Sequence, residues 1–173
     1  VWLAHGIHFP PDEIARLGKA GVGIAHCPGS NMVLASGMCP AVELERAGSP
    51  VGIGVDGSAS EDASNLMQEA RQALQVQRLR YGAASVSHTD VLRWATAGSA
   101  RCLGRDDIAM FRLDEPRFSG AGDPLAALIL CGAHRADRVM VGGEWRVVDG
   151  TIAGLDIDAL MACHASAAGE LIA

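Results

Sequence analysis

The chain has 173 residues, of which 49% are apolar and 4% aromatic, and 21 are glycine. This length supports a domain with a hydrophobic core, and the composition favours an α/β protein whose buried strands carry small aliphatic side chains. A formal net charge of −6, without a basic cluster, argues against nucleic acid or an anionic membrane as a partner. Because no apolar run reaches the roughly 18 residues of a membrane-spanning helix, we expect a soluble protein.

The sequence begins Val-Trp-Leu-Ala-His, which resembles neither a start methionine nor a signal peptide. We expect these residues to form a strand within a longer protein. Five cysteines are present and none forms a Cys-x-x-Cys pair. This pattern favours reduced thiols in the cytoplasm, with the cysteines as small buried side chains, over disulfides or a structural zinc site. The cysteines are Cys27, Cys39, Cys102, Cys131 and Cys163.

The first part of the chain repeats one unit three times: an apolar run, a polar loop and a helix. Short apolar strands that alternate with helices indicate parallel βαβ units buried on both faces. The strands are expected at about residues 1–5, 22–26 and 51–55, and the helices at 11–19, 40–47 and 62–81, with a loop over 28–37.

The rest of the chain follows a different pattern, with turn signals at Gly142-Gly143 and Asp149-Gly150. It indicates a small β-rich unit and a terminal helix. Helices are expected at residues 89–100 and 155–172, and strands at 109–113, 128–131 and 139–148.

Polar side chains follow each of the three apolar strands. Active sites of (β/α)₈ barrels form at the carboxyl ends of the strands, yet a barrel takes about 250 residues. The chain is therefore either a smaller open sheet or a piece of a larger barrel. The polar residues are His5 and His8, then His26, Ser30 and Asn31, then Asp56, Ser58 and Ser60.

Asp56 is the strongest candidate for a functional residue. It ends the apolar run 51–55, where an ionised carboxylate is costly unless it is paired or bound to metal. The alternative is an ordinary aspartate that starts a turn. His5 and His26 also sit at strand ends, and each has a structural alternative, as a buried histidine or as part of a tight turn.

Two histidines and an aspartate at consecutive strand ends describe part of a metal hydrolase site. They do not complete one, because a catalytic zinc normally has three protein ligands and a water. Other acidic and aromatic side chains are expected to be solvated or helix-start acids (Glu61, Asp62, Glu69) or packing residues (Trp94, Trp145).

Several motifs together resemble the amidohydrolase superfamily, in the branch of guanine deaminase, S-adenosylhomocysteine deaminase and the triazine hydrolases. They are Leu-Ala-His-Gly-Ile-His-Phe at 3–9, His-Cys-Pro-Gly-Ser-Asn-Met at 26–32, Leu-Ala-Ser-Gly-Met-Cys-Pro at 34–40, Gly-Ile-Gly-Val-Asp-Gly-Ser-Ala-Ser at 52–60 and Asn-Leu-Met-Gln-Glu-Ala-Arg at 65–71.

The resemblance implies an α/β fold. Residues 1–104 would form the C-terminal part of a (β/α)₈ barrel, residues 105–150 strands of a small β-sandwich, and residues 151–173 a C-terminal helix. A homodimer fits the family.

The resemblance also implies roles for single residues. His5 would contact the hydrolytic water or the substrate, and Asp56 would bind one divalent metal and accept a proton from its water. His26, Ser30, Asn31 and Ser58 would shape the site or contact substrate. Zinc is the first expectation for the metal, with iron or manganese as alternatives.

The implied reaction is attack of a metal-activated hydroxide on a purine-like ring, which expels ammonia. We expect 8-oxoguanine as the substrate, giving urate. Guanine, S-adenosylhomocysteine and chlorotriazines are alternatives within the same branch.

The sequence departs from the family pattern in two places. The family's His-x-His and His-x-x-Glu motifs are absent, so we expect this chain alone to bind metal weakly and to be inactive. A non-catalytic fragment is therefore the rival hypothesis. A Gly-rich segment usual before Ala109 is also absent, either deleted or omitted from the sequence.

Overall fold

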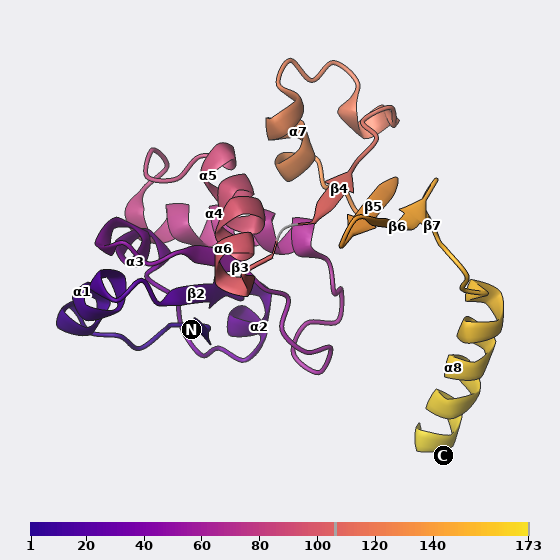
Figure 1. The fold of residues 1–173 in the computed structure, drawn as a ribbon, viewed down its shortest axis with the longest axis horizontal. Coiled ribbons are helices and arrows are strands. Elements are labelled where there is room, and N and C mark those ends of the chain that lie inside the picture. The colour runs from indigo at the N-terminus through magenta and orange to yellow at the C-terminus, as the bar shows by residue number, and fades with distance from the viewer. Residues whose placement is uncertain (106, 173) are drawn as a thin grey trace.

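The computed structural model describes residues 1–105 and 107–172. It is an α/β structure with one parallel and one antiparallel sheet (Figure 1). The parallel sheet has the order β1-β2-β3, formed by Trp2–Ala4, Gly23–His26 and Val51–Ile53. Leu3 pairs with Ile24, and Ile24 with Val51. The three expected parallel strands are therefore confirmed.

Three helices follow these strands as expected. Helix α1 (Pro11–Lys19) begins with proline and two acidic residues, which suit the positive end of a helix dipole. Helix α3 (Ala41–Ala47) ends at Gly48, whose φ of 109° suits glycine. Helix α4 (Leu66–Tyr81) starts later than expected, because the Asn65 side chain caps it by accepting from two backbone N–H groups.

The expected loop over 28–37 was wrong in its first half. Residues Pro28–Val33 form a short helix, α2, with Pro28 in its first turn. Proline lacks the N–H that the first helical turn leaves unpaired, so it is favoured there. This helix carries Ser30 and Asn31 to the carboxyl end of the sheet.

A continuous helical segment covers the expected 89–100 helix. It comprises α5 (His88–Arg93), a π-helical turn η1 (Trp94–Gly98) and α6 (Ser99–Leu103). Its close approach to β3 depends on Gly98, where a Cβ would lie 1.7 Å from the Val51 carbonyl oxygen. Ser99 Oγ then accepts from the Ile53 N–H at 3.1 Å, so this edge of β3 is covered.

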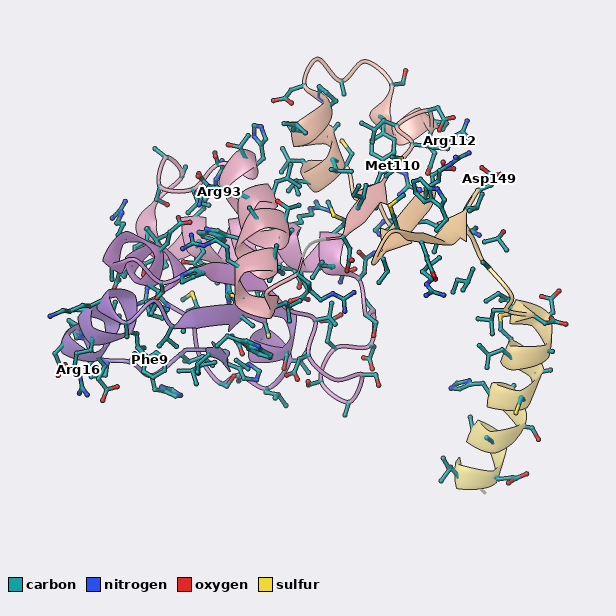
Figure 2. The ribbon with its side chains drawn as sticks, in the orientation of Figure 1. Phe9, Arg16, Arg93, Met110, Arg112 and Asp149 are labelled. Carbon is teal, nitrogen blue, oxygen red and sulfur yellow. The ribbon has the colours of Figure 1, made fainter. Side chains whose placement is uncertain are left out.

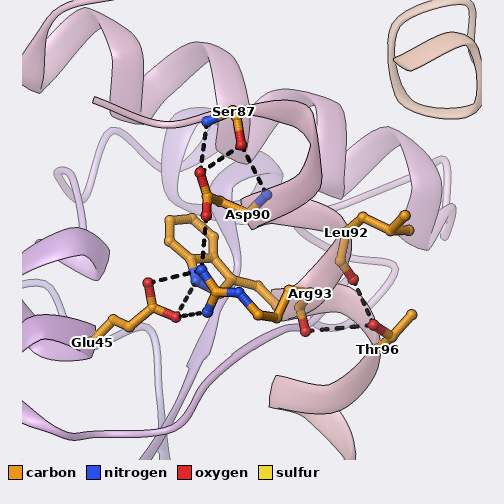
Figure 3. A network of polar contacts seen from close by, with 7 residues as sticks. Glu45, Ser87, Asp90, Leu92, Arg93 and Thr96 are labelled. Carbon is orange, nitrogen blue, oxygen red and sulfur yellow. Dashed lines mark hydrogen bonds and ion pairs between the residues drawn. The ribbon is translucent and has the colours of Figure 1, made fainter. Parts of the chain in front are cut away.

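A polar network ties α3 to this helical segment (Figure 3). The Glu45 carboxylate pairs with Arg93 and accepts from the indole N–H of Trp94 at 2.8 Å. Arg93 also reaches Asp90, at 2.8 Å. Since Trp94 is 1% exposed, Glu45 supplies the partner that its buried N–H requires.

The antiparallel sheet has the order β4-β5-β6-β7. Its strands are Ile108–Met110, Arg138–Val141, Glu144–Val148 and Thr151–Ile152. Gly142 and Gly143 form the β5–β6 turn with positive φ, so the expected hairpin is confirmed. The expected strand at 128–131 was wrong, because Asp123 caps a helix, α7 (Pro124–Leu130), at that place. A single 3₁₀ turn, η2 (Pro116–Phe118), precedes it.

The terminal helix α8 (Ile157–Ile172) extends away from the rest of the structure (Figure 1). Side chains crowd together between the parallel sheet and its helices, whereas those of α8 stand apart (Figure 2). The main core includes Ile24, Leu44, Leu74 and Trp94. Within the described residues, no helix combines the length and apolar character needed to cross a bilayer.

The five cysteines are all free. Cys27 and Cys39 are buried, and burial raises their thiol pKa values to about 11 and about 12. Cys131 and Cys163 are exposed, so the expectation that the cysteines are buried was wrong for these two.

Candidate active site

His5 and Asp56 lie at the carboxyl ends of β1 and β3, and their side chains meet across β2. His5 Nε2 is 3.6 Å from Asp56 Oδ2. Both residues have left-handed backbone, with φ of 63° and 66°. A non-glycine residue there costs on the order of 1–3 kcal/mol, and such strain is concentrated at functional sites.

Asn31 orients the His5 ring. Its Oδ1 lies 2.8 Å from His5 Nδ1. Because an amide oxygen can only accept, this contact places a hydrogen on Nδ1 and turns Nε2 towards Asp56. Asn31 is 3% exposed, so the partner of His5 is held within the packed protein.

Asp56 is held in its ionised form by hydrogen bonds. The Ser30 hydroxyl donates to Asp56 Oδ2 at 2.5 Å, and the Gly57 N–H donates to Oδ1 at 2.8 Å. These bonds, with that of Ser30 first, lower the pKa of Asp56. Asp56 therefore presents a negative charge at neutral pH, with its side chain about one third exposed (33%).

Ser60, one of the polar residues expected after the third apolar run, contacts Asp56 from the following loop. Its hydroxyl lies 3.3 Å from Asp56 Oδ2 and 2.9 Å from Ser30 Oγ. Ser58, the candidate from the sequence, is exposed in the same turn. The turn geometry that brings Ser60 back towards Asp56 is not visible in the order of residue types.

His26 is placed differently from His5, since it is 1% exposed and lies inside the structure. Its Nε2 is 3.4 Å from Gln77 Nε2 on α4. Burial, with a smaller effect of nearby His5, lowers the pKa of His26 to about 4, so the ring is neutral at neutral pH. His26 thus packs behind the His5–Asp56 pair.

Glu61 and Glu69, expected to be solvated or helix-start acids, are both buried. Glu69 does lie in the first turn of a helix, α4. Glu61 is 6% exposed and Glu69 is fully buried, while Asp62 is exposed as expected. The Gly29 N–H donates to Glu69 Oε2 at 2.9 Å, which explains how a carboxyl group is held there. The sequence did not predict this burial, because glutamate is almost never fully buried unless it is paired.

Two of the described side chains at the strand ends have the chemistry of metal ligands. Asp56 offers an ionised carboxylate and His5 an imidazole nitrogen, both suitable donors for a divalent ion. No group of three or more His, Cys, Asp or Glu side chains gathers in the described part of the chain. These residues therefore suit one or two coordination positions and do not by themselves complete a zinc site.

A large hollow lies away from His5 and Asp56. It has a volume of about 970 Å³ and lies where the start of α4, helix α6 and the small sheet come together. Its lining includes Met67, Leu103 and Phe111 and does not include His5 or Asp56. The hollow is therefore separate from the candidate site at the strand ends.

Comparison with known proteins identifies the family to which the chain belongs. Residues 1–109 match the amidohydrolase family. The chain belongs to this family. It is 64% identical to 8-oxoguanine deaminase of Pseudomonas aeruginosa, over 99% of this chain and 41% of that protein. It is also 38% identical to isoxanthopterin deaminase from an unknown prokaryotic organism, over 92% of this chain and 39% of that protein.

A solved structure agrees in both sequence and fold. Atrazine chlorohydrolase from Arthrobacter aurescens, complexed with zinc, superposes with a TM-score of 0.88 at 35% identity. The match covers 96% of this chain and 40% of that structure. The chain thus spans about two fifths of the length of the relatives it matches.

Proposed function

We propose that the protein containing this chain is a metal-dependent aminohydrolase that converts 8-oxoguanine and water into urate and ammonia. The proposed substrate rests on the 64% identity with 8-oxoguanine deaminase over nearly all of the chain. In this reaction the oxygen of water replaces the exocyclic amino group on the ring carbon, and that group leaves as ammonia.

The proposed chemistry assigns separate roles to the paired side chains. Asp56, ionised and partly exposed, would bind one divalent ion and accept a proton from the attacking water. His5, whose Nδ1 faces Asn31, would use Nε2 to hold the water or the substrate. Zinc is the proposed ion, because the solved relative is complexed with zinc; when bound, the ion supplies Lewis acidity that activates water.

Supporting residues are proposed around the pair. Ser30 and Asn31 would fix Asp56 and His5, and Ser58 would line the approach for substrate. His26 would shape the site from behind. We propose that residues 1–104 form the C-terminal part of a (β/α)₈ barrel. The small sheet domain, expected over 105–150, also includes strand β7 (Thr151–Ile152), and the terminal helix, expected over 151–173, is α8 (Ile157–Ile172).

A substrate panel tests the proposal. The complete protein is assayed for ammonia release with 8-oxoguanine, guanine, isoxanthopterin and S-adenosylhomocysteine, and for chloride release with atrazine. The largest kcat/KM is expected with 8-oxoguanine. Activity confined to another of these compounds would reject the substrate and keep the hydrolase chemistry, whereas no activity with any of them would reject the function.

A further inference from the structure

Helix α2 begins at a contact with a residue 40 positions away in the sequence. The Gly29 N–H donates to Glu69 Oε2 at 2.9 Å, and Glu69 lies in the first turn of α4. The glutamate is fully buried, so water does not compete for this bond. Gly29 leaves no room for a side chain, since a Cβ would lie 2.2 Å from Glu69 Oε1.

The two residues after Gly29 contact both members of the candidate catalytic pair. Ser30 donates to Asp56 at 2.5 Å, and Asn31 contacts His5 at 2.8 Å. Three successive residues of α2 therefore connect Glu69 to Asp56 and His5. Because Ser30 and Asn31 directly follow Gly29 in the same short helix, we expect a displacement at the start of α2 to shift both contacts together.

The surroundings of Glu69 favour its protonated form. A Cβ at Gly29 would lie 2.2 Å from Glu61 Oε2 as well, so the two carboxyl groups are close neighbours. Glu69 Oε1 and Gln72 Oε1 are buried and have no hydrogen-bond partner among the described residues. Burial, followed by the nearby charges of Glu61 and Asp56, raises the pKa of Glu69 to about 7. A protonated Glu69 has one O–H group, which can donate to one neighbouring acceptor while Oε2 still accepts from Gly29.

We propose that Glu69 is a positioning residue, which fixes the start of α2 and thereby sets the placement of Asp56 and His5 for the reaction. The proposal rests on the proposed function, because it assigns the placement to that chemistry. The proposal depends on the hydrogen bond that Glu69 accepts from the Gly29 N–H. This role needs a hydrogen-bond acceptor at position 69 and does not need a negative charge.

Two substitutions separate the hydrogen bond from the packing. Glu69→Gln keeps an oxygen for the Gly29 N–H and replaces the protonated oxygen by an amide that donates to the neighbouring acceptors. Glu69→Leu keeps a similar volume and removes the acceptor. Leu74→Ala is the matched control, because Leu74 is buried on the same helix and takes no part in these hydrogen bonds.

The expected results concern turnover in the complete protein with zinc supplied. Glu69→Gln should retain kcat within about threefold. Glu69→Leu should lower kcat by roughly 10–100-fold, the effect of misplacing reacting groups by about an ångström, with little change in KM. Leu74→Ala should lower the melting temperature at least as much and retain near-normal kcat. Equal kcat in Glu69→Leu and Leu74→Ala, or a Glu69→Gln variant as slow as Glu69→Leu, would overturn the proposal.

A crystal structure of Glu69→Leu decides the positioning role without any assay. The Ser30–Asp56 and Asn31–His5 contacts, at 2.5 and 2.8 Å here, should lengthen or break. If both stay unchanged, Glu69 does not position the pair, whatever the activity. If they break while the wild-type protein releases no ammonia from any substrate, the positioning role stands and the proposed function fails.

Discussion

His5 and Asp56 share an unusual backbone conformation and face one another. Both have φ near 65°, at 63° and 66°, and His5 Nε2 lies 3.6 Å from Asp56 Oδ2. The two residues end different strands of one parallel sheet, so the pairing depends on the register of that sheet. Their strained conformations persist because Asn31 and Ser30 hold the side chains from α2.

Replacing His5 tests whether it acts on the water or substrate or binds the metal. His5→Asn should lower kcat substantially while the zinc content per chain stays nearly unchanged, because the proposed role of His5 is not metal binding. Metal analysis and turnover on the same preparation check this. A loss of zinc equal to that of an Asp56 variant would make His5 a ligand instead.

Glu45 should matter more for stability than its partner Arg93. Glu45→Ala leaves the buried Trp94 N–H without its acceptor, which costs about 1–3 kcal/mol. Arg93 is about half exposed (49%), so Arg93→Ala should cost no more than about 1 kcal/mol. Urea unfolding of the two variants measures the difference, and equal losses would contradict this account of Figure 3.

Gly98→Ala should destabilise the protein, because the new Cβ would lie 1.7 Å from the Val51 carbonyl oxygen. Overpacking of this kind costs roughly 1–3 kcal/mol or more. Gly169→Ala is the control, since nothing lies within 4 Å of its Cβ position in α8. It should be neutral or stabilising by up to about 1 kcal/mol, as alanine favours a helix. Thermal unfolding of both variants checks the contrast.

The titration of Glu69 should make the free energy of unfolding depend on pH. Its folded pKa, about 7, is above the ordinary value of 4.5, so the folded state binds the proton more tightly. Tighter proton binding by the folded state contributes to the free energy of unfolding. This stabilisation is fully present below about pH 4.5 and is lost as pH rises through 7. Glu69→Gln cannot ionise, so its stability relative to wild type should rise between these values. If the difference in urea midpoint between Glu69→Gln and the wild type does not change with pH, Glu69 does not have the raised pKa described here.

Much of the fold could be predicted because its signals are local. Apolar runs of strand length, Pro11 at a helix start and Gly142-Gly143 at a turn each determine their own structure. The errors occurred where a proline in the first turn began a helix. Asp123 and Pro124 begin a helix where an apolar segment favoured a strand, and Pro28 begins one where a loop was expected.

The candidate pair was predictable for the same reason, since His5 and Asp56 directly follow apolar runs of the sequence. Its supporting residues were not all predictable. Glu69 reaches Gly29 across 40 residues, and its burial follows from how α4 packs against α2. Spacing along the chain contains no information on that contact.

Turnover of 8-oxoguanine by the complete protein and its Asp56→Asn variant tests the central claim most directly. The change keeps the shape and removes the charge that attracts a divalent ion and accepts a proton. Ammonia release by the wild type is expected, with kcat in the variant lower by roughly 10²–10⁴. Asp62→Asn, an exposed neighbour, should leave kcat unchanged. An Asp56→Asn variant with full zinc occupancy and near-normal kcat would show that the carboxylate is structural and contradict the account.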